Sequence, residues 1–101
     1  MDFSPQIGHE QAGSRPGLVI SPLSYNAKTN LAMVCPITSK SKNYSFEAPI
    51  ISNDIKGVAL LDQISSIDWE RRNIKYVSRI KLKDFERLLL KLRMFLEIRD
   101  F

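Results

Sequence analysis

Short apolar segments alternate with polar connections through residues 18–80 of the chain. Their length and their content of Val, Ile and other β-favouring residues predict strands. The segments are residues 18–20, 31–37, 46–51, 58–64 and 76–80. Pro36 stands near the end of the second segment and predicts a bulge or a sheet edge there, because proline cannot donate a hydrogen bond to a neighbouring strand.

Turn-forming and polar residues occupy the connections. Residues 25–30, Tyr-Asn-Ala-Lys-Thr-Asn, predict a turn or loop rich in hydrogen-bonding side chains, and residues 38–44 predict a flexible polar loop. Gly57, with the Asn-Asp pair shortly before it, marks a further connection. Residues 67–72 predict a short helical or turn segment.

The last part of the chain carries a helical pattern. Its apolar residues recur at spacings of three and four, which predicts one amphipathic helix with a buried stripe. The stripe consists of Phe85, Leu88, Leu89, Leu92, Phe95 and Leu96. Leu90 and Met94 lie off the stripe, which indicates either a second contact, such as a dimer interface, or a broader buried face. Short strands followed by one terminal helix predict a single mainly β domain over residues 1–101, built as a small, mostly antiparallel barrel.

Composition narrows the class of protein. Apolar residues make up 44% of the chain, enough for one small core. No stretch approaches the roughly 18 apolar residues of a membrane span, and the start shows no secretory-signal pattern. The single Cys35, expected to be a buried structural thiol, fits a reducing compartment such as the cytoplasm. His9 and Cys35 cannot form an ordinary zinc site, and no glycine-rich loop cradles a nucleotide, so we expect neither metal nor cofactor.

Positive charge is concentrated in the C-terminal third. Residues 71–101 carry ten Lys and Arg against four Asp and Glu, a net charge of +6 in a chain whose total is +4. A basic surface attracts nucleic acid or an acidic protein segment. The same charges on a helix can also serve only to keep it soluble, and both interpretations stay open.

A polar loop at residues 10–16 offers the clearest candidate chemistry. Its sequence, Glu-Gln-Ala-Gly-Ser-Arg-Pro, supplies a carboxylate, an amide, a hydroxyl and a guanidinium immediately before the apolar strand at residues 18–20. Loops fixed by a rigid strand often carry binding and catalytic groups. The alternative is a simple turn at Gly13 and Pro16 with Arg15 as a solvated surface charge.

Three blocks of sequence resemble the MazF/PemK family of toxin endoribonucleases. Residues 10–22, Glu-Gln-Ala-Gly-Ser-Arg-Pro-Gly-Leu-Val-Ile-Ser-Pro, resemble the first signature of the family. Residues 34–47, which begin Val-Cys-Pro-Ile-Thr-Ser-Lys, resemble its central strand and loop, and residues 57–69 resemble its late strand. The blocks occur in the family's order and cover most of the chain. The resemblance implies an SH3-like barrel with helices packed on it.

The resemblance also implies a chemistry. It points to a metal-independent, sequence-specific endoribonuclease that cuts single-stranded RNA and leaves a 2′,3′-cyclic phosphate and a 5′-hydroxyl. Arg15 matches the catalytic arginine of the family and Thr38 its catalytic threonine. Glu10 matches an acidic position and is a candidate base or orienting group, whereas the family does not generally place a histidine at His9, which we interpret as incidental. On sequence alone, Thr38 could instead cap a turn at a strand end.

We expect neighbouring polar side chains to recognise the substrate. Single-stranded RNA is read on its splayed bases through hydrogen bonds and stacking. Gln11 and Gln63 can bond base edges, Lys42 can bind phosphate, and Ser39 and Ser41 can contribute weaker contacts. Residues 40–45 match the family only in part, so this loop is expected to vary with the target sequence.

The family further implies a homodimer and a MazE-like antitoxin whose acidic C-terminal segment covers the RNA site. Residues 1–5 are expected to end a first strand that is truncated here, since related toxins carry several more residues before Asp2. Two alternatives remain open. One is a CcdB-like toxin that poisons DNA gyrase without being an enzyme, and the other is a truncated toxin that binds antitoxin but cannot cut RNA.

Overall fold

The computed structural model describes residues 6–10, 16–52, 55–72 and 74–100. The strands are β1 (Gln6–Glu10), β2 (Pro16–Val19), β3 (Leu31–Thr38), β4 (Glu47–Ile51), β5 (Lys56–Leu60), β6 (Ser65–Asp68) and β7 (Ile74–Arg79). The helices are α1 (Leu23–Thr29), the 3-10 helix η1 (Leu61–Gln63) and α2 (Leu82–Leu96). The prediction for residues 1–5 falls outside the described part of the chain.

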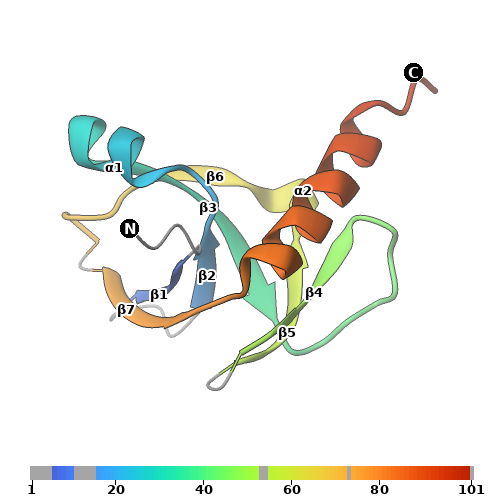
Figure 1. Ribbon diagram of the computed structural model, residues 1–101, viewed down its shortest axis with the longest axis horizontal. Coiled ribbons are helices and arrows are strands. Elements are labelled where there is room, and N and C mark those ends of the chain that lie inside the picture. Colours follow the sequence, from blue (N-terminus) through green and yellow to red (C-terminus); the bar gives the residue numbers. More distant parts are fainter. Residues whose placement is uncertain (1–5, 11–15, 53–54, 73, 101) are drawn as a thin grey trace.

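All seven strands belong to one antiparallel sheet in the order β4-β5-β3-β2-β1-β7, with β6 paired to β3 beside this path (Figure 1). The prediction of a mainly β domain with a C-terminal helix is therefore confirmed. A closed barrel is not what forms, because the strand pairing of the described residues ends at β4 on one side and at β7 on the other. β1 was not predicted from the sequence, and it pairs with both β2 and β7.

β3 is the central strand. It pairs with β2 on one side, while the other side pairs with β6 through residues 31–34 and with β5 through Ile37 and Thr38. Pro36 lies between these two pairings, opposite Gly17 of β2. The sequence predicted a bulge or an edge at Pro36, and the edge is wrong, since the proline lies where β3 changes partner rather than at the side of the sheet.

The turn predicted at residues 25–30 is part of a helix. α1 begins after Pro22, whose carbonyl accepts the N–H groups of Tyr25 and Asn26 at 3.0 Å, and it ends at Asn30 in the left-handed conformation with φ of 60°. No residue of α1 is buried, so no apolar stripe marks it in the sequence. The indole N–H of Trp69 donates to the Asn26 carbonyl at 3.1 Å and ties α1 to the chain after β6.

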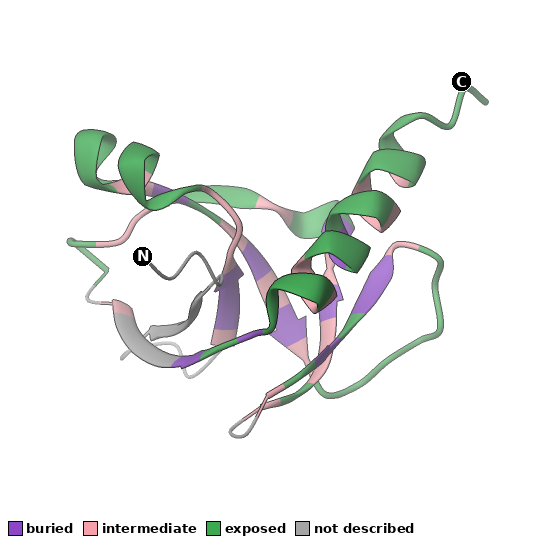
Figure 2. Ribbon diagram, in the orientation of Figure 1, coloured by how far each residue is buried: buried purple, intermediate pink, exposed green. Residues whose placement is uncertain are grey.

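The core lies where β2, β3, β4 and β5 face α2 (Figure 2). Its buried residues are Leu18, Cys35, Ile37, Ala48, Ile50, Ala59, Leu61, Ile80 and Leu88. Leu88 is the buried residue of α2, and Phe85 and Leu92 pack against the core beside it.

The buried stripe of α2 is narrower than predicted. Leu89 and Leu96 are 41% and 70% exposed, and Leu90 and Met94 are exposed as well. The idea of a broader buried face is thus wrong for the single chain, and the exposed leucines are left for another contact. In the described residues no helix is long and apolar enough to cross a membrane.

Two boundaries differ around β5. Gly57 lies inside this strand and not in the connection before it, and the predicted strand at residues 58–64 ends at Leu60, where η1 begins. The segment predicted as helical or turn-like at residues 67–72 starts within β6 and continues as turns. These shifts place η1 beside β3.

Candidate functional site

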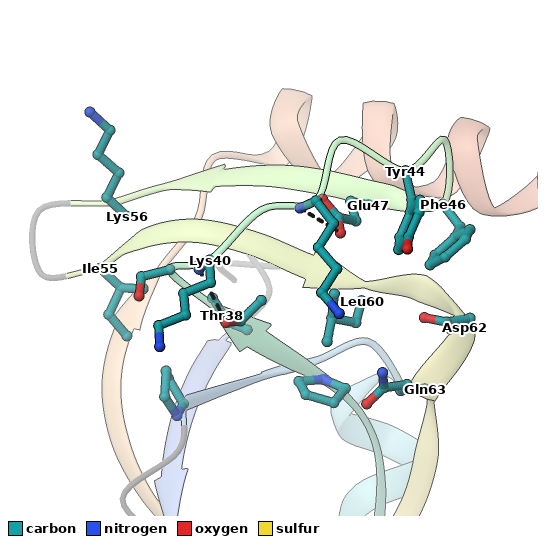
Figure 3. A pocket seen from close by; sticks show the side chains of 15 residues that line it. Thr38, Lys40, Tyr44, Phe46, Glu47, Ile55, Lys56, Leu60, Asp62 and Gln63 are labelled. Carbon is teal, nitrogen blue, oxygen red and sulfur yellow. Dashed lines mark hydrogen bonds between the residues drawn. The ribbon is translucent and has the colours of Figure 1, made fainter.

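A cavity of about 640 Å³ lies at the carboxyl end of β3 (Figure 3). We call it the Thr38 cavity. Its walls come from Pro16 at the start of β2, the end of β3, the loop at residues 39–46, strand β5 and helix η1. The polar side chains among its lining residues are Thr38, Ser39, Lys40, Lys42, Tyr44, Glu47, Lys56, Asp62 and Gln63.

Thr38 is the last residue of β3, at the floor of this cavity. Its Oγ1 accepts a hydrogen bond from the Lys40 backbone N–H at 3.2 Å, which turns the chain out of the strand. A hydroxyl can donate one bond in addition to those it accepts. Within the described part of the chain no acceptor engages this hydrogen, so the Thr38 hydroxyl can donate to a bound anion.

Close backbone packing fixes the position of Thr38. Gly57 of β5 approaches the Thr38 carbonyl so closely that a β-carbon at Gly57 would collide with that oxygen and would lie 3.3 Å from Cγ2 of Ile37. Only glycine allows this approach without displacing the end of β3. The sequence therefore uses Gly57 to set where the Thr38 hydroxyl lies.

Glu47 anchors the loop that forms one wall of the cavity. Its side chain is only 5% exposed, and its Oε1 accepts a 2.7 Å hydrogen bond from the Ser41 hydroxyl. The Lys42 backbone N–H donates to both carboxylate oxygens at 3.2 Å. The Ser41 hydroxyl, the backbone N–H groups of Lys42 and Asn43 and the Lys42 charge together hold the pKa of Glu47 below its usual range, against the effect of burial.

Cys35 is a structural thiol, as expected. It is fully buried, and its Sγ donates to the Leu60 carbonyl at 3.0 Å, which links β3 to the end of β5. Burial, assisted by the negative charge of Asp62, raises the pKa of Cys35 to about 12. A thiol of this kind is inert near neutral pH and supports the cavity without taking part in chemistry.

Cations outnumber anions along the cavity. Lys40, Lys42 and Lys56 line it, against the carboxylates of Glu47 and Asp62. Because the Glu47 carboxylate is already bonded to the loop, the lysines are the groups available to an anionic ligand. Among the described residues, no group of three or more His, Cys, Asp and Glu side chains could hold a metal ion.

The basic C-terminal third is a separate feature. Four of its ten Lys and Arg residues lie on α2. Of these, Arg93 pairs with Glu97 at 2.9 Å and Arg87 lies 4.0 Å from Asp84. α2 contributes no lining residue to the Thr38 cavity. The helix charges are thus partly paired and do not form the candidate site.

The structure brings several predicted site residues together. Thr38, Ser39, Lys42 and Gln63 all line the cavity although they come from β3, a loop and η1. Ser41 is not a lining residue; its hydroxyl donates to Glu47, and its predicted RNA contact stays a prediction.

The predicted residues of the N-terminal loop are described only in part. Glu10 is the last residue of β1, where its backbone pairs with Ile74, and its side chain is not described. Gln11 and Arg15 lie outside the described residues. The residue after Arg15 in the sequence is Pro16, which lines the cavity.

Sequence reasoning missed Glu47, Asp62 and Tyr44. A carboxylate directly before the apolar residues 48–51 was the available signal for Glu47, because a charge entering a core must be hydrogen-bonded there. Asp62 and Tyr44 gave no comparable signal. Each lines the cavity only because η1 and the loop fold back beside β3.

Together these features define a small antiparallel β protein with a lysine-lined cavity built around a threonine. A family described as PemK-like, MazF-like toxins of type II toxin–antitoxin systems matches residues 1–96. The endoribonuclease toxin MazF of Escherichia coli strain K12 is 47% identical over 72 residues, which are 71% of this chain and 65% of the relative. The endoribonuclease PemK of Escherichia coli is 31% identical over 85 residues, covering 79% of this chain and 64% of the relative.

The solved structures agree with the sequence comparison. A chain in a crystal structure of MazE–MazF from Deinococcus radiodurans superposes with a TM-score of 0.82 at 31% identity, covering 96% of this chain and 100% of that one. This chain belongs to the PemK-like, MazF-like family of type II toxin–antitoxin toxins. It spans slightly less than two thirds of the length of the two curated relatives.

Proposed function

We propose that this chain is a toxin that cleaves single-stranded messenger RNA at a short specific sequence in the cytoplasm. The cleavage uses no metal and leaves a 2′,3′-cyclic phosphate and a 5′-hydroxyl, and loss of messenger RNA stops translation and growth. The observation that carries the proposal is the Thr38 hydroxyl, held by Lys40 and Gly57 at the floor of a lysine-lined cavity. The relatives named endoribonucleases give it further support.

The chemistry needs no group from outside the chain and the substrate. The RNA 2′-oxygen attacks the adjacent phosphorus and the bond to the 5′-oxygen breaks, so the protein must accept one proton, supply another and stabilise the charged phosphorane. The Thr38 hydroxyl donates to a phosphate oxygen. A guanidinium makes two charge-assisted bonds to phosphate, and we assign this role to Arg15. Glu10 is the candidate base for the 2′-hydroxyl proton.

RNA binding is assigned to the polar groups around Thr38. The ammonium groups of Lys40 and Lys42 neutralise flanking phosphates, and Gln63 on η1 presents an amide that can donate to and accept from a base edge. Ser39 lines the cavity beside Thr38 and can bond phosphate or base. We assign Gln11 and Ser41 to the same binding surface on the basis of their sequence positions.

Regulation follows from the same cationic surface. We propose that a MazE-like antitoxin inserts an acidic, disordered segment over the Thr38 cavity, where its carboxylates replace the RNA phosphates. The similarity of this chain to a chain in crystal structures of MazE–MazF from Deinococcus radiodurans supports a partner of this kind. We also propose a homodimer, in which exposed apolar residues of α2 such as Leu90 and Met94 become buried.

Cleavage of a long single-stranded RNA in EDTA tests the proposal. The wild-type protein should cut at one short motif, and the products should carry the two stated ends. Arg15→Ala and Thr38→Ala should each lower the rate by roughly 10²–10³-fold, the loss seen when one donor to a developing charge is removed. Thr38→Ser keeps a hydroxyl and should retain most activity, and Arg99→Ala, at an exposed position after α2, should cut normally.

Each other outcome has a defined meaning. If the folded wild-type protein leaves the RNA intact, the proposed ribonuclease activity would be overturned, and DNA gyrase would be the next target to test. Cleavage that persists in both the Arg15→Ala and Thr38→Ala proteins would contradict the assigned site. Cleavage that requires added Mg²⁺ would contradict the metal-independent mechanism.

A further inference from the structure

An exposed aromatic ring stands at one end of the Thr38 cavity. Tyr44 is 50% exposed, and its ring stacks on Phe46 with centroids 5.0 Å apart and planes 25° from parallel. Both residues line the cavity. Figure 3 shows the two rings side by side, with Asp62 and Gln63 of η1 below them in this view. A large apolar surface kept exposed beside polar groups marks a binding surface.

The ring is supported from behind. Phe46 also contacts Phe95 of α2, at a centroid distance of 5.6 Å and an angle of 44°. Phe46 is partly buried and packs against the core, so Tyr44 is the outermost ring of a stack that starts at the helix. With one face of the Tyr44 ring against Phe46, its exposed surface includes the face turned away from this stack.

The backbone at Tyr44 is held in place on both sides. The Glu47 N–H donates to the Tyr44 carbonyl at 3.1 Å, which closes a turn, and the Leu61 N–H donates to the Phe46 carbonyl at 3.0 Å. The Ser41 and Lys42 bonds to the Glu47 carboxylate fix the preceding part of the loop. A ring that is already positioned loses little freedom when a flat ligand stacks on it.

We propose that Tyr44 is a nucleobase-stacking platform, on which one base of the single-stranded RNA lies while its phosphate backbone passes Thr38. This rests on the function proposed above. Aromatic side chains stack on single-stranded bases of any identity, so Tyr44 adds affinity without choosing the base. The edge of the stacked base then faces the polar groups of η1, and Gln63 reads it. Loss of the ring should raise KM and leave kcat almost unchanged.

Binding and cleavage are measured separately to test this. The binding probe is a set of labelled single-stranded DNA oligomers of about ten nucleotides, within the usual site size of single-strand binders, which lack the 2′-hydroxyl and cannot be cut. Tyr44→Leu should weaken their binding by about 5- to 100-fold, the range expected for one lost base stack. Tyr44→Phe should bind like the wild type. Tyr25→Leu, at another exposed tyrosine on α1, is the matched control.

A spectroscopic measurement makes the test independent of folding of the variants. Oligomers that carry 2-aminopurine at successive positions lose fluorescence when that base stacks on an aromatic ring. The wild-type protein should quench one position strongly, and Tyr44→Phe should preserve the quenching. Binding of the wild-type protein with no quenching at any position would overturn the proposal, whether or not Tyr44→Leu folds.

The outcomes separate this inference from the proposed function. RNA cleavage with an unchanged KM in folded Tyr44→Leu would overturn the stacking platform and leave the ribonuclease intact. Tyr44-dependent binding and quenching without any cleavage by the wild type would support the platform and overturn the enzyme. A wild type that binds no oligomer, or Tyr44→Phe that loses as much affinity as Tyr44→Leu, would also overturn the platform.

Discussion

The hydroxyl of Ser41 donates a 2.7 Å hydrogen bond to Oε1 of Glu47, whose side chain is almost fully buried. This contact closes the loop at residues 39–46 onto the start of β4 and places Lys42 and Tyr44 on the wall of the Thr38 cavity. A carboxylate that would be unfavourable in the core is thereby satisfied by the loop it holds. The geometry of this wall, which we propose binds RNA, consequently depends on the charge of Glu47.

The stability supplied by the Glu47 carboxylate should depend on pH. Its pKa in the folded protein lies below the ordinary value of 4.5, because the Ser41 hydroxyl and the Lys42 and Asn43 amides favour the charged form. The stabilisation is therefore fully present above pH 4.5 and is lost as the pH falls through the lower folded value. Melting temperatures of wild type and Glu47→Gln should differ at pH 7 and converge in acid.

Glu86→Gln is the control for this pH series, since Glu86 is an exposed carboxylate on α2. Its melting temperature at pH 7 should match that of the wild type. A Glu47→Gln protein as stable as the wild type at pH 7 would contradict the anchoring role. Reduced RNA binding by folded Glu47→Gln is also expected, because the loop at residues 39–46 would lose its fixed position.

Gly57→Ala should displace Thr38 and lower both stability and cleavage. The new methyl group would collide with the Thr38 carbonyl group, which is backbone and cannot turn aside as a side chain can. We expect destabilisation of about 1–3 kcal/mol, as for overpacked sites, measured by denaturant unfolding. The RNA cleavage rate of the folded fraction should also fall, because the Thr38 hydroxyl moves with its carbonyl.

Gly17→Ala is the comparison for Gly57→Ala, because the obstacle at Gly17 is a side chain and not the backbone. The methyl group there would meet Cγ1 of Val34, a side-chain atom, so the double change Gly17→Ala with Val34→Ala should relieve the clash. Gly57→Ala has no such rescue, because its main obstacle is a backbone oxygen. Full cleavage activity in Gly57→Ala would show that the position of Thr38 does not limit the reaction.

The sequence pattern predicts the part of this fold that is apolar and repetitive. β2, β3, β4 and α2 are rich in apolar residues and each contributes to the core, as Leu18 and Leu88 do, so they could be identified for that reason. α1 buries no residue and is fixed instead by Pro22, Asn30 and the Trp69 contact, so its pattern is that of a loop. β1 also lacks a pattern that would identify it as a strand. It is short and contains Gly8 and His9, and it is defined by its pairing with β2 and β7.

The candidate site likewise contains residues that could be predicted from the sequence and residues that could not. Thr38 and Gln63 could be named from the family resemblance because they lie in the matching blocks, and the structure brings both to one cavity. The contribution of Tyr44 depends on its stacking against Phe46 and Phe95, which joins a loop to a helix about fifty residues later in the chain. Contacts between such distant segments have no local pattern in the sequence.

Cys35 should make the protein less stable in alkali. Its folded pKa is raised from 9.0 to about 12, so the unfolded thiol ionises first and stability falls as the pH rises above 9.0. The difference between wild type and Cys35→Ser, which cannot ionise, should change by about 1.4 kcal/mol per pH unit in this range. Unfolding in urea at successive pH values measures this difference.

A labelling experiment tests the burial of Cys35 separately. Iodoacetamide at pH 8 should label Cys35 only after denaturation, and rapid labelling of the native protein would contradict the burial.

The exposed apolar residues of α2 should be buried in a homodimer. Leu90 and Met94 are 57% and 63% exposed, and together with Ser45, Phe95 and Ile98 they line a further, mainly apolar cavity of about 370 Å³. A charge placed there would have to be desolvated on association, so Leu90→Glu should shift the protein toward monomer. Sedimentation over a concentration series measures the shift. Leu23→Glu on α1, which is 64% exposed, should leave association unchanged. If Leu90→Glu associates like the wild type while Leu23→Glu does not, the dimer forms through α1. The exposed Leu90 and Met94 side chains of α2 would then be available to the antitoxin.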